Sequence, residues 1–212
     1  MRWLLYGLAA LGPVALAIVL FVIFTGGTSS SSGGGATGSL GPAVDFSKLP
    51  GIRTGPAPWD PGYNGLPDRL KPLGLDALPA EALKLHIHEY LYIFVDGKQI
   101  KVPDNIGIYD GDFITELHTH PGESGFIHVE APKEQTYSLG QFFGVWGVRL
   151  SKNCIGGYCG TPSKPLRIYV NGKLFKGPDP TRIGLHAHDV FAIVYGKPPK
   201  KIPSKHDFSA VG

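Results

Sequence analysis

The sequence predicts a β-rich α+β fold, and three features carry this prediction. Gly 30 and Pro 19 in 212 residues favour many turns and short strands over long helices. Two β-hairpin signals occur after residue 85, and one capped helix lies between them. The order of hairpin, helix, hairpin and final strand resembles a β-grasp fold; a small barrel or sandwich carrying one helix is the alternative.

The N-terminal run Trp3–Phe24 contains no charged residue. A helix of this length would span about 33 Å, which is enough to cross a bilayer core. We therefore expect residues 1–24 to be an uncleaved transmembrane anchor; a cleaved signal peptide, with an apolar region of about 7–15 residues, is the alternative. Arg2 precedes the run and Asp45 is the first charge after it, so the positive-inside rule places the rest of the chain outside the cytoplasm.

Three further segments flank the predicted domain, which covers residues 85–196. Residues 25–45 are rich in Gly and Ser and are expected to form a flexible linker. Residues 46–84 are rich in Pro and Gly and suggest an extended arm on the domain surface, with a short helix at Pro79–Leu85. Residues 197–212 are predicted to be a basic, mobile tail.

The two hairpin signals share one sequence pattern, a β-type run followed by a turn dipeptide that ends in glycine. Asp96–Gly97 follows the aromatic and β-branched run Tyr90–Val95, and Asn171–Gly172 follows Arg167–Val170. Type I′ turns need positive φ at both central residues, and these dipeptides supply it. The repeat is either a duplicated binding unit or a common type of β-hairpin that occurs twice.

Between the hairpins we expect a strand over Phe126–Val129 and one helix. Ser138 and Gln141 form a capping box, and Gly147 is placed to end the helix in a left-handed conformation. A last strand is expected over Val190–Tyr195. Together these elements suggest a compact α+β domain.

Cys154 and Cys159 are the chain's 2 cysteines. In an oxidising compartment, two nearby cysteines are typical of a disulfide, here one that closes a short loop. A thioredoxin-type pair would have two intervening residues, whereas four stand here. The net charge of +3 and the lack of an arginine-rich or lysine-rich face give no support to nucleic-acid binding.

The 8 histidines are the main functional signal. Six of them form three His-x-His pairs, which are His86 with His88, His118 with His120, and His186 with His188. Residues i and i+2 of a strand point to one face, so two imidazoles can converge on one cation. We expect His186 and His188 to face solvent in a turn.

The candidate metal ligands are therefore five histidines: His86, His88, His118, His120 and His128. Glu123 or Glu130 could complete the site as a ligand, as a general base or by orienting a ligand. Imidazole donors suit copper or zinc and do not select sharply between them. The alternative is a structural cluster in which the rings satisfy hydrogen bonds.

Several motifs together resemble a group of uncharacterised bacterial proteins that are exported or membrane-anchored. They are the first His-x-His with its hairpin, Leu117–His120, Phe126–Glu130 and Leu139–Gly147. The resemblance covers about Leu85 to Gly196 and implies a location outside the cytoplasm, but it supplies no activity. Pro121 stands where the group usually has aspartate, which removes a possible carboxylate ligand.

These observations predict a single-pass protein of the bacterial cell membrane whose external domain binds copper or zinc. A non-enzymatic accessory or scaffold subunit of a larger membrane complex is the alternative, because a single anchor and a long arm suit such a role. A metal-dependent hydrolase or oxygenase with Glu123 or Glu130 as base is a third possibility. No nucleophile elbow or phosphate loop supports an enzyme.

Overall fold

The computed structural model describes residues 39–109 and 111–211. The predicted anchor and most of the predicted linker lie outside these residues. Within the described part of the chain, no helix has both the length and the apolar character needed to span a bilayer.

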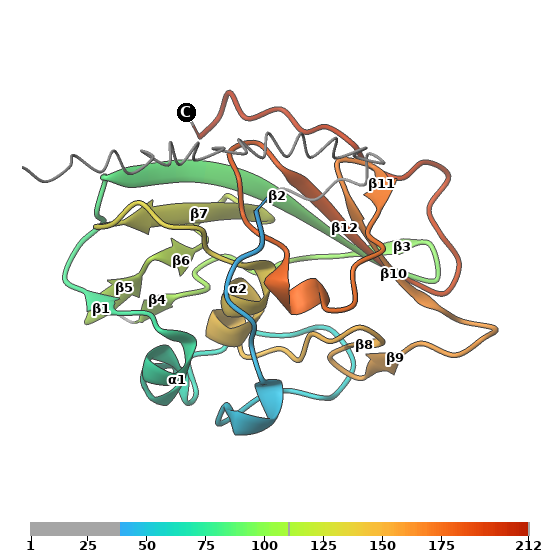
Figure 1. Cartoon of the computed structure of the whole chain (residues 1–212), viewed down its shortest axis with the longest axis horizontal. Helices are drawn as coiled ribbons and strands as arrows, with labels where there is room; N and C mark the ends of the chain where they lie inside the picture. Colours follow the sequence, from blue (N-terminus) through green and yellow to red (C-terminus); the bar gives the residue numbers. More distant parts are fainter. Residues whose placement is uncertain (1–38, 110, 212) are drawn as a thin grey trace, which may run out of the picture. The chain divides into compact units, whose positions relative to one another are not determined.

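A seven-stranded mixed sheet organises the domain, in the order β11-β10-β12-β2-β7-β6 with β3 also paired to β2 (Figure 1). Its strands are β2 (Leu85–Val95), β3 (Lys98–Ile100), β6 (Leu117–His118), β7 (Phe126–Ala131), β10 (Leu166–Val170), β11 (Lys173–Leu174) and β12 (Val190–Tyr195). The first half of β2 pairs antiparallel with β7, and its second half pairs parallel with β12. β2 therefore joins the two halves of the sheet.

Both predicted hairpins are confirmed. β2 pairs with β3 and β10 pairs with β11, each across the expected dipeptide. The turn residues have positive φ, at 48° for Asp96 and 82° for Gly97, and at 50° for Asn171 and 77° for Gly172. The predicted last strand is also confirmed, as β12.

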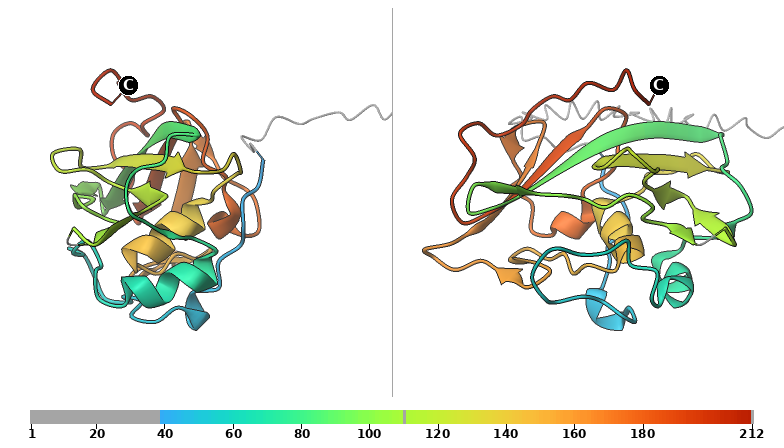
Figure 2. Two further views of the ribbon diagram at one scale, coloured as in Figure 1. Left: turned by 90° about the vertical axis from the view of Figure 1, so that its left-hand side faces the viewer. Right: turned by 180° about the vertical axis from the view of Figure 1, so that it is seen from behind.

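The predicted helix is confirmed as α2 (Leu139–Trp146). Ser138 and Gln141 form the expected capping box, and Gly147 ends the helix with a φ of 71°. All the residues of α2 are buried, because the large sheet covers one side of the helix and α1 (Leu66–Leu73) covers another (Figures 1 and 2). A helix that is apolar all round needs such a position between layers.

The expectation of an extended arm is wrong for residues 66–73, because this part of the arm forms α1, a second helix beside α2. Leu66, Leu70 and Leu73 have helical spacing and are buried, with Gly74 in a left-handed conformation at the C-terminal end. The abundance of Pro and Gly in this segment masked that signal. The helix expected at Pro79–Leu85 is also wrong: this mostly exposed segment has too little packing to stabilise so short a helix.

Smaller elements complete the fold. A three-stranded sheet has the order β1-β5-β4, and β8 pairs with β9. These elements, with the two 3₁₀ helices, are β1 (Ala77–Leu78), β4 (Ile108–Tyr109), β5 (Phe113–Thr115), β8 (Cys154–Ile155), β9 (Tyr158–Cys159), η1 (Phe46–Lys48) and η2 (Pro180–Arg182).

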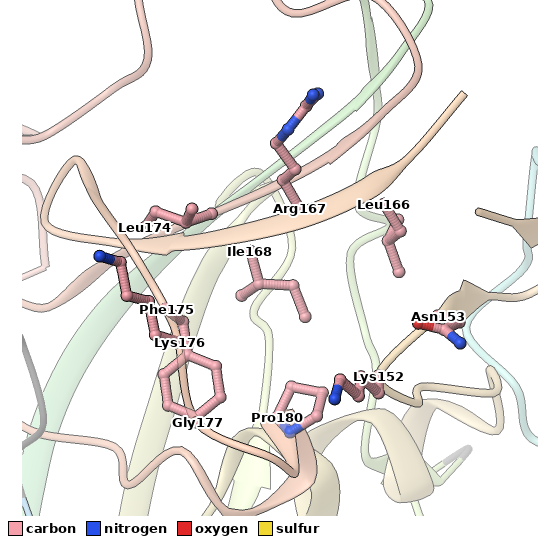
Figure 3. Close-up of a pocket in the computed structure, with 10 residues that line it drawn as sticks. All are labelled: Lys152, Asn153, Leu166, Arg167, Ile168, Leu174, Phe175, Lys176, Gly177 and Pro180. Carbon is pink, nitrogen blue, oxygen red and sulfur yellow. The ribbon is translucent and has the colours of Figure 1, made fainter. Parts of the chain in front are cut away.

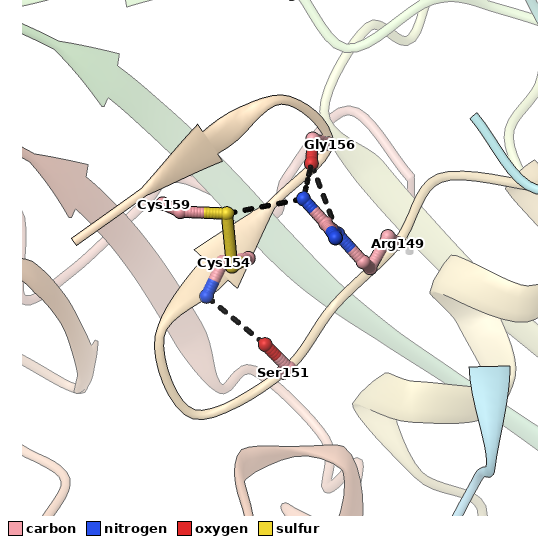
Figure 4. Close-up of a disulfide and its surroundings, with 5 residues drawn as sticks. All are labelled: Arg149, Ser151, Cys154, Gly156 and Cys159. Atoms are coloured by element: carbon pink, nitrogen blue, oxygen red, sulfur yellow. Dashed lines mark hydrogen bonds between the residues drawn. A yellow bond between two sulfur atoms is a disulfide. The ribbon is translucent and has the colours of Figure 1, made fainter. Parts of the chain in front are cut away.

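The predicted disulfide joins Cys154 to Cys159 and ties β8 to β9 (Figure 4). The Arg149 guanidinium braces this loop: its Nη2 donates to the Gly156 carbonyl at 2.7 Å and contacts Cys159 Sγ at 3.1 Å. The bond is typical of a domain that folds outside the cytoplasm.

The C-terminal segment crosses the face of the large sheet opposite α2 (Figure 1). The His206 ring stacks on Tyr90 with 3.5 Å between ring centroids, and its Nδ1 lies 2.8 Å from the Tyr92 hydroxyl. Phe208 stacks on His188 with 4.6 Å between centroids. His206 thus helps to attach this segment to the sheet.

A buried arginine connects the helical layer to the rest of the domain. Arg69 on α1 has no exposed surface, and its Nε donates to the Gly144 carbonyl at 2.8 Å. Its Nη2 donates to the Val145 carbonyl at 3.0 Å, and its Nη1 donates to the Asn64 carbonyl at 2.7 Å. The cation therefore satisfies carbonyls at the C-terminal end of α2, where the helix dipole favours positive charge.

Replacing Arg69 with leucine should destabilise the protein strongly. The substitution leaves several buried carbonyls without a donor, which should lower the free energy of unfolding by at least about 3 kcal/mol. Chemical denaturation measures this loss. Lys71→Ala on the exposed side of the same helix is the control and should change stability by no more than about 0.5 kcal/mol; a loss below about 1 kcal/mol for Arg69→Leu would contradict the capping role.

Candidate metal centre

Three neighbouring strands bring the predicted ligands together. His118 of β6 is the register partner of His128 of β7, which in turn is the register partner of His88 of β2. Glu130 of β7 is the register partner of His86 of β2, two residues beyond the pair of His128 and His88. Alternate residues of a strand share a face, so these side chains gather on the side of the sheet away from α2.

The ring nitrogens lie close to one another within this cluster. His86 Nε2 lies 3.1 Å from His88 Nε2, and His118 Nε2 lies 3.2 Å from His120 Nε2. The His128 ring stands between the pairs, with its centroid 4.6 Å from that of His88 and 4.5 Å from that of His120.

The Glu130 carboxylate lies at the centre of the cluster. Its Oε1 is 3.4 Å from both His86 Nε2 and His128 Nδ1. The same oxygen is 3.8 Å from His118 Nε2 and 3.9 Å from His120 Nε2. The distances from Oε1 to His118 and His120 exceed hydrogen-bond length, so the carboxylate faces these nitrogens without bonding to them.

Hydrogen bonds on the outer side of two rings fix which nitrogen faces the cluster. The Thr115 carbonyl can only accept, so His118 Nδ1 donates to it at 2.9 Å and leaves Nε2 as an acceptor that faces the cluster, 3.2 Å from His120 Nε2. His128 Nε2 lies 2.7 Å from Glu123 Oε2, and this contact turns Nδ1 toward Glu130, 3.4 Å from its Oε1. Metal-ligating histidines are usually oriented in this way.

The burial of the cluster keeps two of its imidazoles neutral at physiological pH. Desolvation lowers the pKa of His118 to about 3 and that of His88 to about 4, and neighbouring histidines add to the effect. Burial also acts to raise the pKa of Glu130, but its interactions with His128, His118 and His86 outweigh this and lower the pKa to about 2. Neutral imidazoles beside an ionised carboxylate are the protonation states that bind metal cations.

Two buried atoms in the cluster have no hydrogen-bond partner, namely His128 Nδ1 and Glu130 Oε2. Buried polar atoms without a partner are costly and therefore uncommon in folded proteins. Both atoms are typical metal ligands, and two overlapping groups of four residues present ligand atoms within 4.8 Å of one another. The groups are His86, His88, His128 and Glu130, and His118, His120, His128 and Glu130. The cluster could therefore hold a metal ion.

The structure assembles all five predicted histidines and adds Glu130 to them. Glu123 contacts His128. Glu116, a nearby carboxylate in the sequence, does not join the cluster, because its Oε2 accepts a hydrogen bond from the backbone N–H of Asp76 at 3.1 Å. Glu81, which the sequence did not suggest, lies 3.5 Å from His120 Nε2. It sits in an irregular segment between β1 and β2, where no spacing rule could identify it.

The third His-x-His pair does not join the cluster, as expected. His186 Nε2 lies 3.0 Å from Ser39 Oγ, and its Nδ1 lies 3.3 Å from Asp189 Oδ2. His188 is exposed and stacks against Phe208. This pair precedes β12 in a turn, where a left-handed φ of 65° at His188 replaces strand geometry.

A cavity of about 270 Å³ lies beside the β10–β11 hairpin (Figure 3). Its lining residues are Lys152, Asn153, Leu166, Arg167, Ile168, Leu174, Phe175, Lys176, Gly177 and Pro180. These residues include neither a histidine nor a carboxylate, so this cavity is separate from the candidate metal centre.

Comparison with protein-family models, with curated proteins and with solved structures finds no match for this chain.

Acid should destabilise the metal-free protein partly through His118. Its folded-state pKa of about 3 lies below the ordinary value of 6.5, so between these values protons bind preferentially to the unfolded chain. Stability from the neutral ring is complete above pH 6.5 and is lost as the pH falls toward 3. Relative to His118→Gln, the free energy of unfolding of the unmodified protein should fall by up to about 1.4 kcal/mol per pH unit.

Denaturant titrations of both proteins between pH 7 and pH 4 measure this difference. The comparison with His118→Gln is needed because the raised pKa of buried Glu89 contributes a pH dependence of opposite sign, which both proteins share. Parallel pH profiles for the two proteins would show that His118 does not titrate as stated.

Proposed function

We propose that this protein binds a first-row transition-metal ion, copper or zinc, at the cluster formed by β2, β6 and β7. The observation that carries the proposal is the pair of buried, unpartnered atoms, His128 Nδ1 and Glu130 Oε2, which both groups of candidate ligands share. A purely structural cluster would be expected to pair buried polar atoms of this kind with hydrogen-bond partners. A cation satisfies both at once.

The donor set favours copper or zinc over the hard cations. Imidazole suits zinc and copper, whereas calcium and magnesium prefer sites made of oxygen ligands. The separations of 3.1 Å and 3.2 Å within the two pairs are close to the roughly 3.3 Å between two ligands of a tetrahedral zinc ion. Both pairs could therefore chelate an ion with little movement.

We further propose that the domain lies outside the cytoplasm, held at a bacterial cell membrane by the apolar N-terminal segment. The Cys154–Cys159 disulfide supports the compartment, and the uncharged run Trp3–Phe24 supports the anchor. We also interpret the strand order β3-β2-β12-β10-β11, with α2 connecting the two hairpins, as a β-grasp-like core. β7 and β6 extend this core on one side and carry the metal ligands.

The alternative, an accessory subunit of a membrane complex, rests on the sequence of the anchor. Its other support was an arm free to wrap a partner, but the described part of the arm packs on its own domain. Trp59 is buried with its ring 5.5 Å from that of Trp146, and Leu66 is fully buried on α1. A metal-binding role has the larger support from the described residues.

Metal analysis of the full-length chain tests the proposed function. The protein is purified without a histidine tag, exposed to zinc or copper, separated from free metal and measured by elemental mass spectrometry. We expect at least one equivalent of bound metal, and at least a tenfold lower affinity when both His118 and His120 are replaced by alanine, because two of the nitrogen ligands are removed.

The matched control replaces His186 and His188 with alanine, which removes a second His-x-His pair outside the cluster. This variant should retain the metal content of the unmodified protein. Less than a tenth of an equivalent in the unmodified protein, or equal losses in the two double variants, would rule out the site.

A further inference from the structure

The six ligand residues of the cluster do not surround a single point. They fall into two overlapping groups, each of which contains one of the two His-x-His pairs together with His128 and Glu130. Two ligands of one zinc ion can be no further apart than twice the metal–nitrogen bond, about 4.2 Å. The donor atoms within each group lie within 4.8 Å of one another, but no group contains both His-x-His pairs. At least one nitrogen of the first pair is therefore further than 4.8 Å from a nitrogen of the second pair. One ion therefore suits one pair, and the second pair is left as a second chelate.

The two pairs are equivalent as chelates. Each has two Nε2 atoms at a similar separation, 3.1 Å for His86 with His88 and 3.2 Å for His118 with His120. Their ring geometries also match, with 4.7 Å between centroids and 78° between ring planes in both pairs. By this geometry, both pairs are equally able to chelate an ion.

Glu130 is placed between the two pairs. Its Oε1 lies 3.4 Å from His86 Nε2 and 3.8 Å from His118 Nε2, so this one oxygen faces a nitrogen of each pair. Its Oε2 is buried and has no hydrogen-bond partner, so it is also available to a cation. A carboxylate placed in this way can bridge two ions, which are about 3.5–4 Å apart in two-metal sites.

We propose that the cluster holds two transition-metal ions of the copper or zinc class, bridged by the Glu130 carboxylate. One ion is bound by His86 and His88, and the other by His118 and His120. His128 supplies Nδ1 to one of them, since Glu123 occupies its Nε2. The inference rests on the proposed function and adds the number of ions and the role of Glu130.

The surrounding charge supports two cations at short distance. Glu130 contributes one negative charge between them, Glu123 lies 2.7 Å from the far nitrogen of His128, and Glu81 lies 3.5 Å from His120 Nε2. In a buried site these carboxylates reduce the repulsion between the ions. The exposed side chain of His86 leaves a route to the first pair from solvent.

The test is the number of ions bound by the full-length chain, purified without a histidine tag and stripped with a chelator before titration with zinc. We expect two equivalents for the unmodified protein and for the His186→Ala, His188→Ala control. We expect one equivalent for His86→Ala with His88→Ala, and one for His118→Ala with His120→Ala. Glu130→Gln keeps all the imidazoles and should weaken the second binding step at least tenfold.

Copper(II) loading gives a second readout that needs no variant. Two bridged copper ions couple magnetically, so the electron paramagnetic resonance intensity should fall below that of two isolated ions as the second equivalent binds. One equivalent in the unmodified protein, with full uncoupled intensity, would overturn the bridged pair but leave the proposed function intact. No bound metal would overturn the bridged pair and the proposed function together. Because the unmodified protein is measured, the test does not depend on whether a histidine variant folds.

Discussion

The pairing of β7 with both β2 and β6 is the constraint on which the candidate site depends. Register fixes His88 beside His128 and His128 beside His118, and a shift of one residue would turn these rings toward α2. The opposite face of the same strands carries the apolar residues that pack against α2, including Ile127 and Val129. The hydrophobic core therefore sets the register, and the register sets the geometry of the histidines.

The two faces of this sheet have different chemistry. On one face, α2 fits between the sheet and α1, and buried Arg69 satisfies the carbonyls at its end. On the other face, a polar cluster is buried around Glu130. A fully satisfied polar network stabilises one arrangement, whereas unpartnered atoms such as His128 Nδ1 cost free energy until a ligand satisfies them. Such a cost within a well-packed domain is typical of a binding site, where stability is given up for function.

The C-terminal segment extends the same polar and aromatic face beyond the cluster. Tyr90 follows His88 at the next position on this face of β2, and His206 stacks on its ring. Phe208 stacks on His188, whose backbone N–H donates to the His88 carbonyl. The end of the chain is thus in contact with residues adjacent to the candidate ligands and limits solvent access to that side of β2.

The sequence alone determined the elements whose signals are local. The Asp96–Gly97 and Asn171–Gly172 turns, the capping box at Ser138 and the loop between Cys154 and Cys159 follow from backbone and side-chain chemistry within a few residues. Strand alternation also determined that His86 and His88 of β2 present both rings on one face. Tertiary structure decided which pairs meet, because strand order and register depend on packing between distant segments. It placed Glu130 among the imidazoles and Glu123 on the outer side of His128, brought Glu81 to His120, and folded α1 where Pro and Gly obscured its periodicity.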